Sequence, residues 1–214
     1  RRMLEDICHV PVLGVVPYFN DIHIEEEDSV DLATKSRSLS AQPKVNVAVV
    51  LLRHLSNFTD FNALDHDARV HLFYTNNTSD LLQADIIIVP GSKSTLSDLL
   101  ELRRNGCAES IVRAHRKGTT VLGICGGYQL MGQEVADPDH VEGDIERLPG
   151  LGLLPTTTTM SGEKTTRQTR FTLVPQPHSP QADRPLQGYE IHMGRTLPLN
   201  ATASPLCLLS DGRE

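Results

Sequence analysis

The sequence predicts an α/β fold in which helices cover both faces of a mostly parallel β-sheet. Helical patterns cover about 95–104 and 108–117, and the second helix is closed by Gly118. Four runs have the length and composition of strands, at 45–52, 69–75, 84–90 and 121–125. The first run is apolar and valine-rich, as a central strand buried on both faces should be. Because strands alternate with helices, we expect the sheet to be parallel.

The N-terminal part of the chain has a different character. Residues 10–18 form an apolar run that predicts a strand, whereas residues 20–40 are rich in acids and hydroxyls and predict a solvated connection. We therefore expect residues 1–20 to be the tail of an upstream domain, 21–44 to be a linker and 45–214 to be the main domain.

The pattern changes again beyond Pro149. Shorter strands are expected at 151–155 and 171–174, as antiparallel additions to the sheet. Residues 176–187 contain three prolines and little apolar surface, which predicts a surface loop.

Composition excludes several classes of function. The net charge of −7 and the scattered basic residues argue against a nucleic-acid partner, and no stretch has the length of a transmembrane helix. Nine histidines form no metal-ligand spacing, so no metal site is expected. The cysteines are irregularly spaced without a CxxC pair, which favours a reduced, cytoplasmic protein without disulfides (Cys8, Cys107, Cys125 and Cys207).

The segment Val121–Gln129 (VLGICGGYQ) carries the main functional signal. A predicted strand delivers Cys125 between glycines, and a helix is expected to follow at 129–134. This is the layout of a nucleophile elbow, a sharp strand-to-helix turn that exposes one side chain. A thiolate there would lie over a helix N-terminus, which favours negative charge. The alternative is a buried cysteine in a glycine-rich loop.

A second loop, Pro90–Thr95 (PGSKST), follows another predicted strand. In parallel sheets, ligands bind beyond the carboxyl ends of the strands, so this loop and the Cys125 loop should share one edge.

These motifs resemble a known family when they are taken together with Gly188–Thr196 (GYEIHMGRT) and with 56–61 (SNFTDF). They are similar to the cobyric acid synthase family of glutamine amidotransferases in the cobalamin pathway. The resemblance implies a flavodoxin-like, class I glutamine amidotransferase-like fold. It also implies a two-part enzyme, in which an upstream synthetase domain uses ATP and Mg to activate corrinoid side-chain carboxylates (b, d, e and g) and this domain supplies ammonia from glutamine without a cofactor.

The chemistry of amide hydrolysis then suggests roles for individual residues. Cys125 would attack the glutamine side-chain amide, and backbone amides of Gly126 and of the Gly91-Ser92 loop would hold the oxyanion. The remaining candidates for glutamine binding lie on the elbow helix and on the later strands: Tyr128, Gln129, Arg167, whose fork matches a carboxylate, and Glu190.

The proton shuttle is where the chain departs from the family pattern. Family members continue to a Gly-Thr-Tyr-Leu-His-Gly-type segment, whose histidine is the partner of the cysteine. Residues 1–214 do not include that segment, so the resemblance implies a family base beyond Glu214 and a domain that is truncated at its C-terminal end. His192 is the candidate base within this chain; its alternative role is a hydrogen-bonded histidine beside the site. Residues 1–214 alone are therefore expected to be a weak glutaminase.

Three other functions stay open. They are a redox or stress-response protein with an elbow cysteine, a non-catalytic docking domain, and the amidotransferase part of another cobyrinate-type synthase.

Overall fold

The computed structural model describes residues 2–14, 36–40, 44–175, 185–200 and 204–210. Its first sheet contains four parallel strands in the order β2-β1-β3-β4. The strands lie close to the predicted runs: β1 (Val45–Val50), β2 (Val70–Thr75), β3 (Ile86–Val89) and β4 (Thr120–Gly123). The parallel sheet predicted from the sequence is confirmed.

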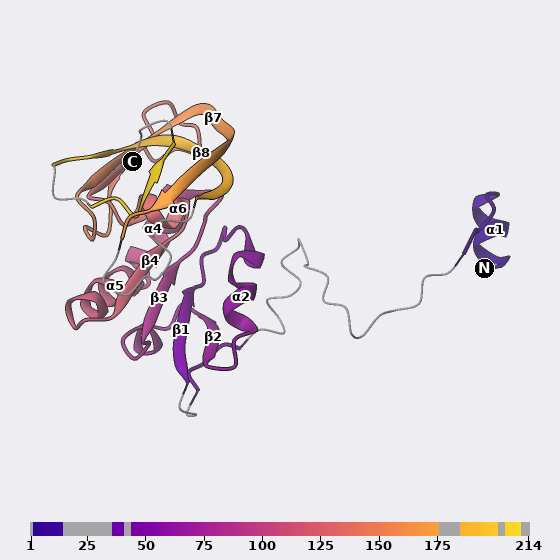
Figure 1. Cartoon of the computed structure of the whole chain (residues 1–214), viewed down its shortest axis with the longest axis horizontal. Coiled ribbons are helices and arrows are strands. Elements are labelled where there is room, and N and C mark those ends of the chain that lie inside the picture. The colour runs from indigo at the N-terminus through magenta and orange to yellow at the C-terminus, as the bar shows by residue number, and fades with distance from the viewer. Residues whose placement is uncertain (1, 15–35, 41–43, 176–184, 201–203, 211–214) are drawn as a thin grey trace.

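Helices flank this sheet, as predicted (Figure 1). The short helices are α2 (Asn62–Asp65) beside β2, the 3-10 turn η2 (Phe58–Phe61) next to it, and α3 (Thr78–Leu81). Two longer helices, α4 (Thr95–Arg104) and α5 (Cys107–Arg116), pack on each other, and α5 also contacts β4. The bounds of α4 are those predicted. Gly118 follows α5 with φ +102°, a conformation that glycine adopts without steric cost.

The core lies between these helices and the sheet. Residues 47–50 of β1 and 87–89 of β3 are at most 1% exposed, which is the burial expected of central strands covered on both faces. Leucines at i, i+3 and i+6 of α4 (Leu96, Leu99 and Leu102) complete the apolar contact. None of the helices in the described ranges has the length and apolar character needed to cross a membrane.

A second sheet contains five strands and is mostly antiparallel. Its path runs β6-β5-β7-β8, with β9 also paired to β7, and only the β5–β7 pair is parallel. The bounds are β5 (Glu134–Ala136), β6 (Arg147–Pro149), β7 (Thr156–Leu173), β8 (Leu186–Pro198) and β9 (Cys207–Leu209). Figure 1 shows the β7–β8 ribbon above the parallel sheet, and helix α6 (Gly126–Leu130) packs against β3, β4 and β5.

The predictions for the C-terminal half are partly wrong. Residues 171–173 form an antiparallel strand as expected, but this strand is the end of the 18-residue strand β7, whose β-branched residues pair with β8, and no strand forms at 151–155. Residues 151–154 form no strand because their backbone amides donate hydrogen bonds to carbonyls at the C-terminal end of α6. Leu151 N, for example, donates to Leu130 O at 2.8 Å.

The helix expected at 129–134 is also wrong in its bounds, and the same hydrogen bonds explain why. Helix α6 begins at Gly126, directly after Cys125, and ends at Leu130. The amides of Leu153 and Leu154 both donate to the carbonyl of Met131 at 2.9 Å, so the chain turns away before Glu134.

The strand expected at 10–18 is wrong in the part that the structure describes. Arg2–Cys8 form helix α1, which has no buried residue, and residues 10–14 are irregular rather than a strand. Residues 15–18 lie outside the described residues, as do 176–184 of the expected surface loop. Leu186 and Gln187, predicted to end that loop, already belong to β8.

The C-terminal boundary of the expected main domain also falls outside the described residues. The structure describes the chain as far as Ser210, so Glu214, beyond which the resemblance implies the family base, is not among the residues it places. The end of the domain and the family histidine therefore stay predictions.

Candidate functional site

Cys125 lies in the turn between β4 and α6. Its backbone has φ 51° and ψ −115°, a conformation that costs a non-glycine residue free energy. Two backbone hydrogen bonds stabilise the turn: Ile124 N donates to Val89 O at 3.0 Å, and Gly127 N donates to Ile124 O at 2.8 Å. The Cys125 side chain is exposed, so the alternative of a buried structural cysteine is wrong.

Glycines beside Cys125 let the helix approach the sheet closely. A Cβ atom on Gly127 would lie 1.9 Å from the carbonyl oxygen of Val89, and one on Gly123 would lie 2.7 Å from the Cα of Tyr128. No side chain fits at either position without moving backbone. The elbow geometry therefore depends on these residues being glycine.

Two backbone amides lie together beside the elbow. A Cβ atom on Gly126 would be 3.0 Å from Ser92 N and 3.4 Å from Thr95 Oγ1, so the two predicted loops meet. Within the part of the chain that the structure describes, neither the Gly126 nor the Ser92 amide donates to a protein acceptor. Paired free amides next to a nucleophile can bind the oxyanion that forms when an amide carbonyl is attacked.

The predicted Gly91 packs against the nucleophile. Its Cβ position would be 3.7 Å from the Cβ of Cys125, which is van der Waals contact, and 2.7 Å from Ser56 Oγ, so a side chain there would force the Ser56 hydroxyl to move. Ser56 N also donates to Gly91 O at 3.0 Å, which ties the loop after β1 to the loop after β3.

A buried carboxylate fixes the Ser92 loop from within α4. Asp98 is 1% exposed and accepts a hydrogen bond from Ser92 Oγ at 2.6 Å. The same carboxylate lies 2.9 Å from His54 Nδ1 and accepts from His54 N at 3.3 Å. Asp98 thus joins the loops that follow β1 and β3 at the edge that carries Cys125.

A second carboxylate reaches the same loop from the β5–β6 connection. Glu142 Oε2 accepts from Thr95 N at 2.6 Å, and Oε1 accepts from Thr95 Oγ1 at 3.0 Å. Burial raises the pKa of Glu142 above its ordinary value, although the hydrogen bonds from Thr95 and Leu96 oppose that change.

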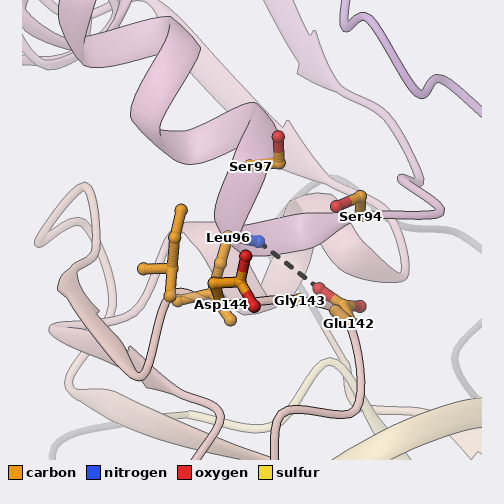
Figure 2. A pocket seen from close by; sticks show the side chains of 7 residues that line it. Ser94, Leu96, Ser97, Glu142, Gly143 and Asp144 are labelled. Carbon is orange, nitrogen blue, oxygen red and sulfur yellow. Dashed lines mark hydrogen bonds between the residues drawn. The ribbon is translucent and has the colours of Figure 1, made fainter.

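Glu142 also lines a cavity of about 250 Å³, shown in Figure 2. Its side chain points toward the start of α4, where Leu96 N donates to it at 3.4 Å. Neither Cys125 nor Gly126 lines this cavity, so it is not the space in front of the nucleophile. The lining residues are Ser94, Leu96, Ser97, Glu142, Gly143, Asp144 and Ile145.

The later candidates gather on the β7–β8 ribbon. Arg167 pairs with Glu190 through two hydrogen bonds, at 2.6 and 3.1 Å, and Glu190 also lies 3.0 Å from His192 Nε2. Burial acts to raise the pKa of Glu190, but hydrogen bonds from His192 and Arg167 outweigh it and the pKa is lowered. The Arg167 fork therefore pairs with a protein carboxylate in this structure, and its role toward the glutamine carboxylate stays a prediction.

His192 is occupied on both sides of its ring. Besides Glu190 at Nε2, its Nδ1 lies 3.1 Å from Gly194 O. No hydrogen bond between His192 and Cys125 is present in the structure. To act as the base, His192 would have to exchange one of these partners for the thiol.

The two elbow-helix candidates differ in their surroundings. Tyr128 is 41% exposed, and partial burial raises the pKa of its phenol. Gln129 is 6% exposed, and its Nε2 donates to Met193 O at 2.9 Å. Gln129 thus ties the elbow helix to β8, a structural task that its place in the motif did not reveal.

Cys107 contrasts with Cys125. It is fully buried in α5, burial raises the pKa of its thiol to about 11, and its Sγ donates to Asn76 O at 3.1 Å. A thiol that stays protonated is a poor nucleophile. Among the residues that the structure describes, no group of three or more His, Cys, Asp or Glu side chains is placed to hold a metal ion.

The fold and the elbow define the class of protein, a glutamine amidotransferase-like α/β domain. Two solved structures share the fold: a crystal structure of a glutamine amidotransferase (TM-score 0.56, 18% identity, 78% of this chain and 82% of that chain) and PurLQS from Thermotoga maritima (TM-score 0.56, 17% identity, 78% and 75%). At these identities the likeness concerns the fold alone.

The chain belongs to the family of CobB/CobQ-like glutamine amidotransferase domains, whose family model matches residues 46–213. Cobyric acid synthases from Bacteroides fragilis, Phocaeicola vulgatus and Parabacteroides distasonis are 68%, 62% and 50% identical over 214 residues, which is 100% of this chain. The chain spans 42% of the length of each of these relatives. The family predicted from the motifs is confirmed, and it does not favour the redox alternative.

Proposed function

We propose that this chain is the glutaminase part of a cobyric acid synthase, which hydrolyses glutamine to supply ammonia for the amidation of corrinoid carboxylates. One observation carries the proposal. In a CobB/CobQ-like domain, Cys125 stands exposed in a strained elbow, beside two free amides from separate loops. Relatives that match the whole chain are named cobyric acid synthase, which supports the choice of acceptor.

The reaction on glutamine has two halves. The Cys125 thiolate attacks the side-chain carbonyl carbon, and the oxygen takes up negative charge facing the Ser92 and Gly126 amides. The C–N bond then breaks, ammonia leaves after receiving a proton, and a thioester remains on Cys125. Water hydrolyses the thioester, which releases glutamate and restores the thiol.

A histidine must carry the proton from the thiol to the departing nitrogen. The resemblance assigns that role to a residue beyond Glu214, and His192 is the alternative within this chain. Since Glu190 and Gly194 engage its ring, we infer that His192 orders the β7–β8 side of the site. Arg167 and Glu190 would contact glutamine from that ribbon, and Tyr128 and Gln129 from helix α6.

The partners follow from the same proposal. Residues 45–214 would act with an ATP- and Mg-dependent synthetase domain that binds the corrinoid, and residues 1–20 would be the last piece of that domain. No cofactor is proposed within residues 45–214. A reducing compartment such as the cytoplasm is proposed because the mechanism needs Cys125 as a free thiol.

The test uses the full-length gene product that carries these residues. Cys125→Ser should abolish amidation driven by glutamine and spare amidation driven by added ammonia, because the synthetase needs ammonia from either source. If both activities of a folded variant fell to the same degree, the nucleophile role of Cys125 would be refuted.

A further inference from the structure

Helix α4 is capped at its N-terminus by a residue from a distant part of the chain. Its own N-cap residue, Ser94, makes no side-chain cap hydrogen bond. The carboxylate of Glu142 takes over this task, since Oε2 accepts from both Thr95 N and Leu96 N. A negative group at this position satisfies free amides and interacts favourably with the helix dipole. Figure 2 shows Glu142 directed at the first turn of α4.

Glu142 is itself held in place by a buried carboxylate. Asp137 follows strand β5, is 0% exposed and accepts hydrogen bonds from Val141 N and Glu142 N, both at 2.8 Å. The β5–β6 connection is therefore folded around Asp137, and Glu142 leaves it from a fixed backbone position.

The third hydrogen bond of Glu142 connects it, through Thr95, to the glycine that follows Cys125. Its Oε1 accepts from the hydroxyl of Thr95, which is 1% exposed, and that hydroxyl lies 3.4 Å from the Cβ position of Gly126. The Ser92 amide lies 3.0 Å from the same position. Glu142 thus fixes the end of the loop that packs against Gly126, and the Ser92 amide lies in the same loop.

We propose that Glu142 is a positioning residue for glutamine hydrolysis, which holds the Ser92–Thr95 loop against the elbow so that the Ser92 and Gly126 amides converge on one oxyanion. The inference rests on the proposed function and adds a residue to which no role in the reaction was assigned. Glu142 acts through the loop and does not touch the substrate.

The expected effect falls on one kinetic constant. An oxyanion contact matters most in the transition state, so its displacement lowers kcat and leaves KM largely unchanged. A shift of about 1 Å in such a group costs about 10²-fold in rate, which is the loss we expect for Glu142→Ala. Alkylation of Cys125 by iodoacetamide forms no oxyanion, and its rate should not change.

Three variants of the full-length gene product test the proposal against wild type. Glu142→Gln can keep every contact: its oxygen can replace Oε2, and its amide can donate to a rotated Thr95 hydroxyl, so most of kcat should remain. Asp144→Ala is the matched control, because Asp144 is an exposed residue of the same connection. The readouts are kcat and KM for glutamine, the alkylation rate and thermal unfolding.

The proposal is supported if Glu142→Ala alone loses kcat at constant KM and alkylation rate. It is overturned if Glu142→Ala keeps wild-type kcat, if Glu142→Gln is no better than Glu142→Ala, or if all readouts fall together. Should Glu142→Ala not fold, Glu142→Asp, one methylene shorter, must have a lower kcat than Glu142→Gln, and equality overturns the proposal. Cys125→Ser distinguishes failure of the proposed function from failure of the role of Glu142. If Cys125→Ser keeps glutaminase activity, or if wild type has none, the proposed function fails and this inference fails with it.

Discussion

Gly127→Ala is the sharpest perturbation of the elbow that keeps every functional group. The added Cβ would lie 1.9 Å from Val89 O, 2.5 Å from Val89 C and 2.7 Å from Pro90 O, all of them backbone atoms of the strand end and its loop. None of these atoms can rotate away as a side chain would. The start of α6 must therefore move away from β3 by more than about 1 Å, and Cys125 moves with it.

Two opposing effects determine the change in stability. Alanine in a helix is favoured over glycine by about 0.5–1 kcal/mol, whereas overpacking costs about 1–3 kcal/mol and more when only backbone can yield. We expect a net loss of about 2 kcal/mol, which lowers Tm by roughly 4–8 °C in a chain of this size. A displacement of this size at the nucleophile should lower kcat by about 10²-fold.

Glutaminase kinetics and thermal unfolding check this expectation together. Gly162→Ala is the control, because Gly162 lies in β7 with nothing within 4 Å of its Cβ position, and it should change stability by less than about 0.5 kcal/mol. A Gly127→Ala protein with wild-type kcat and Tm would refute the steric reasoning and the close packing of the elbow.

Three further predictions concern other side chains. His192→Ala should raise KM for glutamine and change kcat by less than tenfold, because Glu190 and Gly194 engage the ring; a loss of about 10²–10⁴-fold in kcat would instead identify His192 as the base. Cys107 should resist iodoacetamide at pH 8 in native protein while Cys125 reacts, because burial raises the Cys107 pKa to about 11; peptide mapping that finds Cys107 labelled first would contradict this. Arg167→Gln should cost about 0.5 kcal/mol of unfolding free energy at pH 7. Since the folded-state pKa of Glu190 lies below its ordinary 4.5, that contribution is present above pH 4.5 and is lost as pH falls through the lowered pKa, so acid titrations of the two proteins should converge.

Local patterns predicted the elements whose structure depends on their own residues. The apolar runs of β1 and β3 and the helical pattern of α4 were found within about two residues of their observed ends. The extent of α6 was not, because it ends where the amides of 151–154 reach its carbonyls across some twenty residues of chain. The long β7–β8 ribbon was also missed, since a threonine-rich run becomes a continuous strand only with its partner beside it.

The site likewise contains residues that local sequence reveals and residues that depend on distant partners. Cys125, Gly126 and Ser92 lie in glycine-rich loops whose sequence reveals a tight turn at a strand end, and the structure brings them together. Asp98 and Glu142 were missed because each has a partner that is distant in sequence: His54 lies 44 residues from Asp98, and Thr95 lies 47 residues from Glu142. The local signal was weak: Ser94 is the N-cap residue that precedes α4, but a serine there does not reveal that another residue caps the helix.

The central claim is that Cys125 carries the glutamyl group during hydrolysis. Acid quenching of the full-length gene product during turnover with glutamine, followed by mass spectrometry of its peptides, tests this directly. We predict a glutamyl thioester on the peptide that contains Cys125, and none in Cys125→Ser. Glutamine hydrolysis that persists in Cys125→Ser, or a thioester found on Cys8, Cys107 or Cys207 instead, would contradict the account.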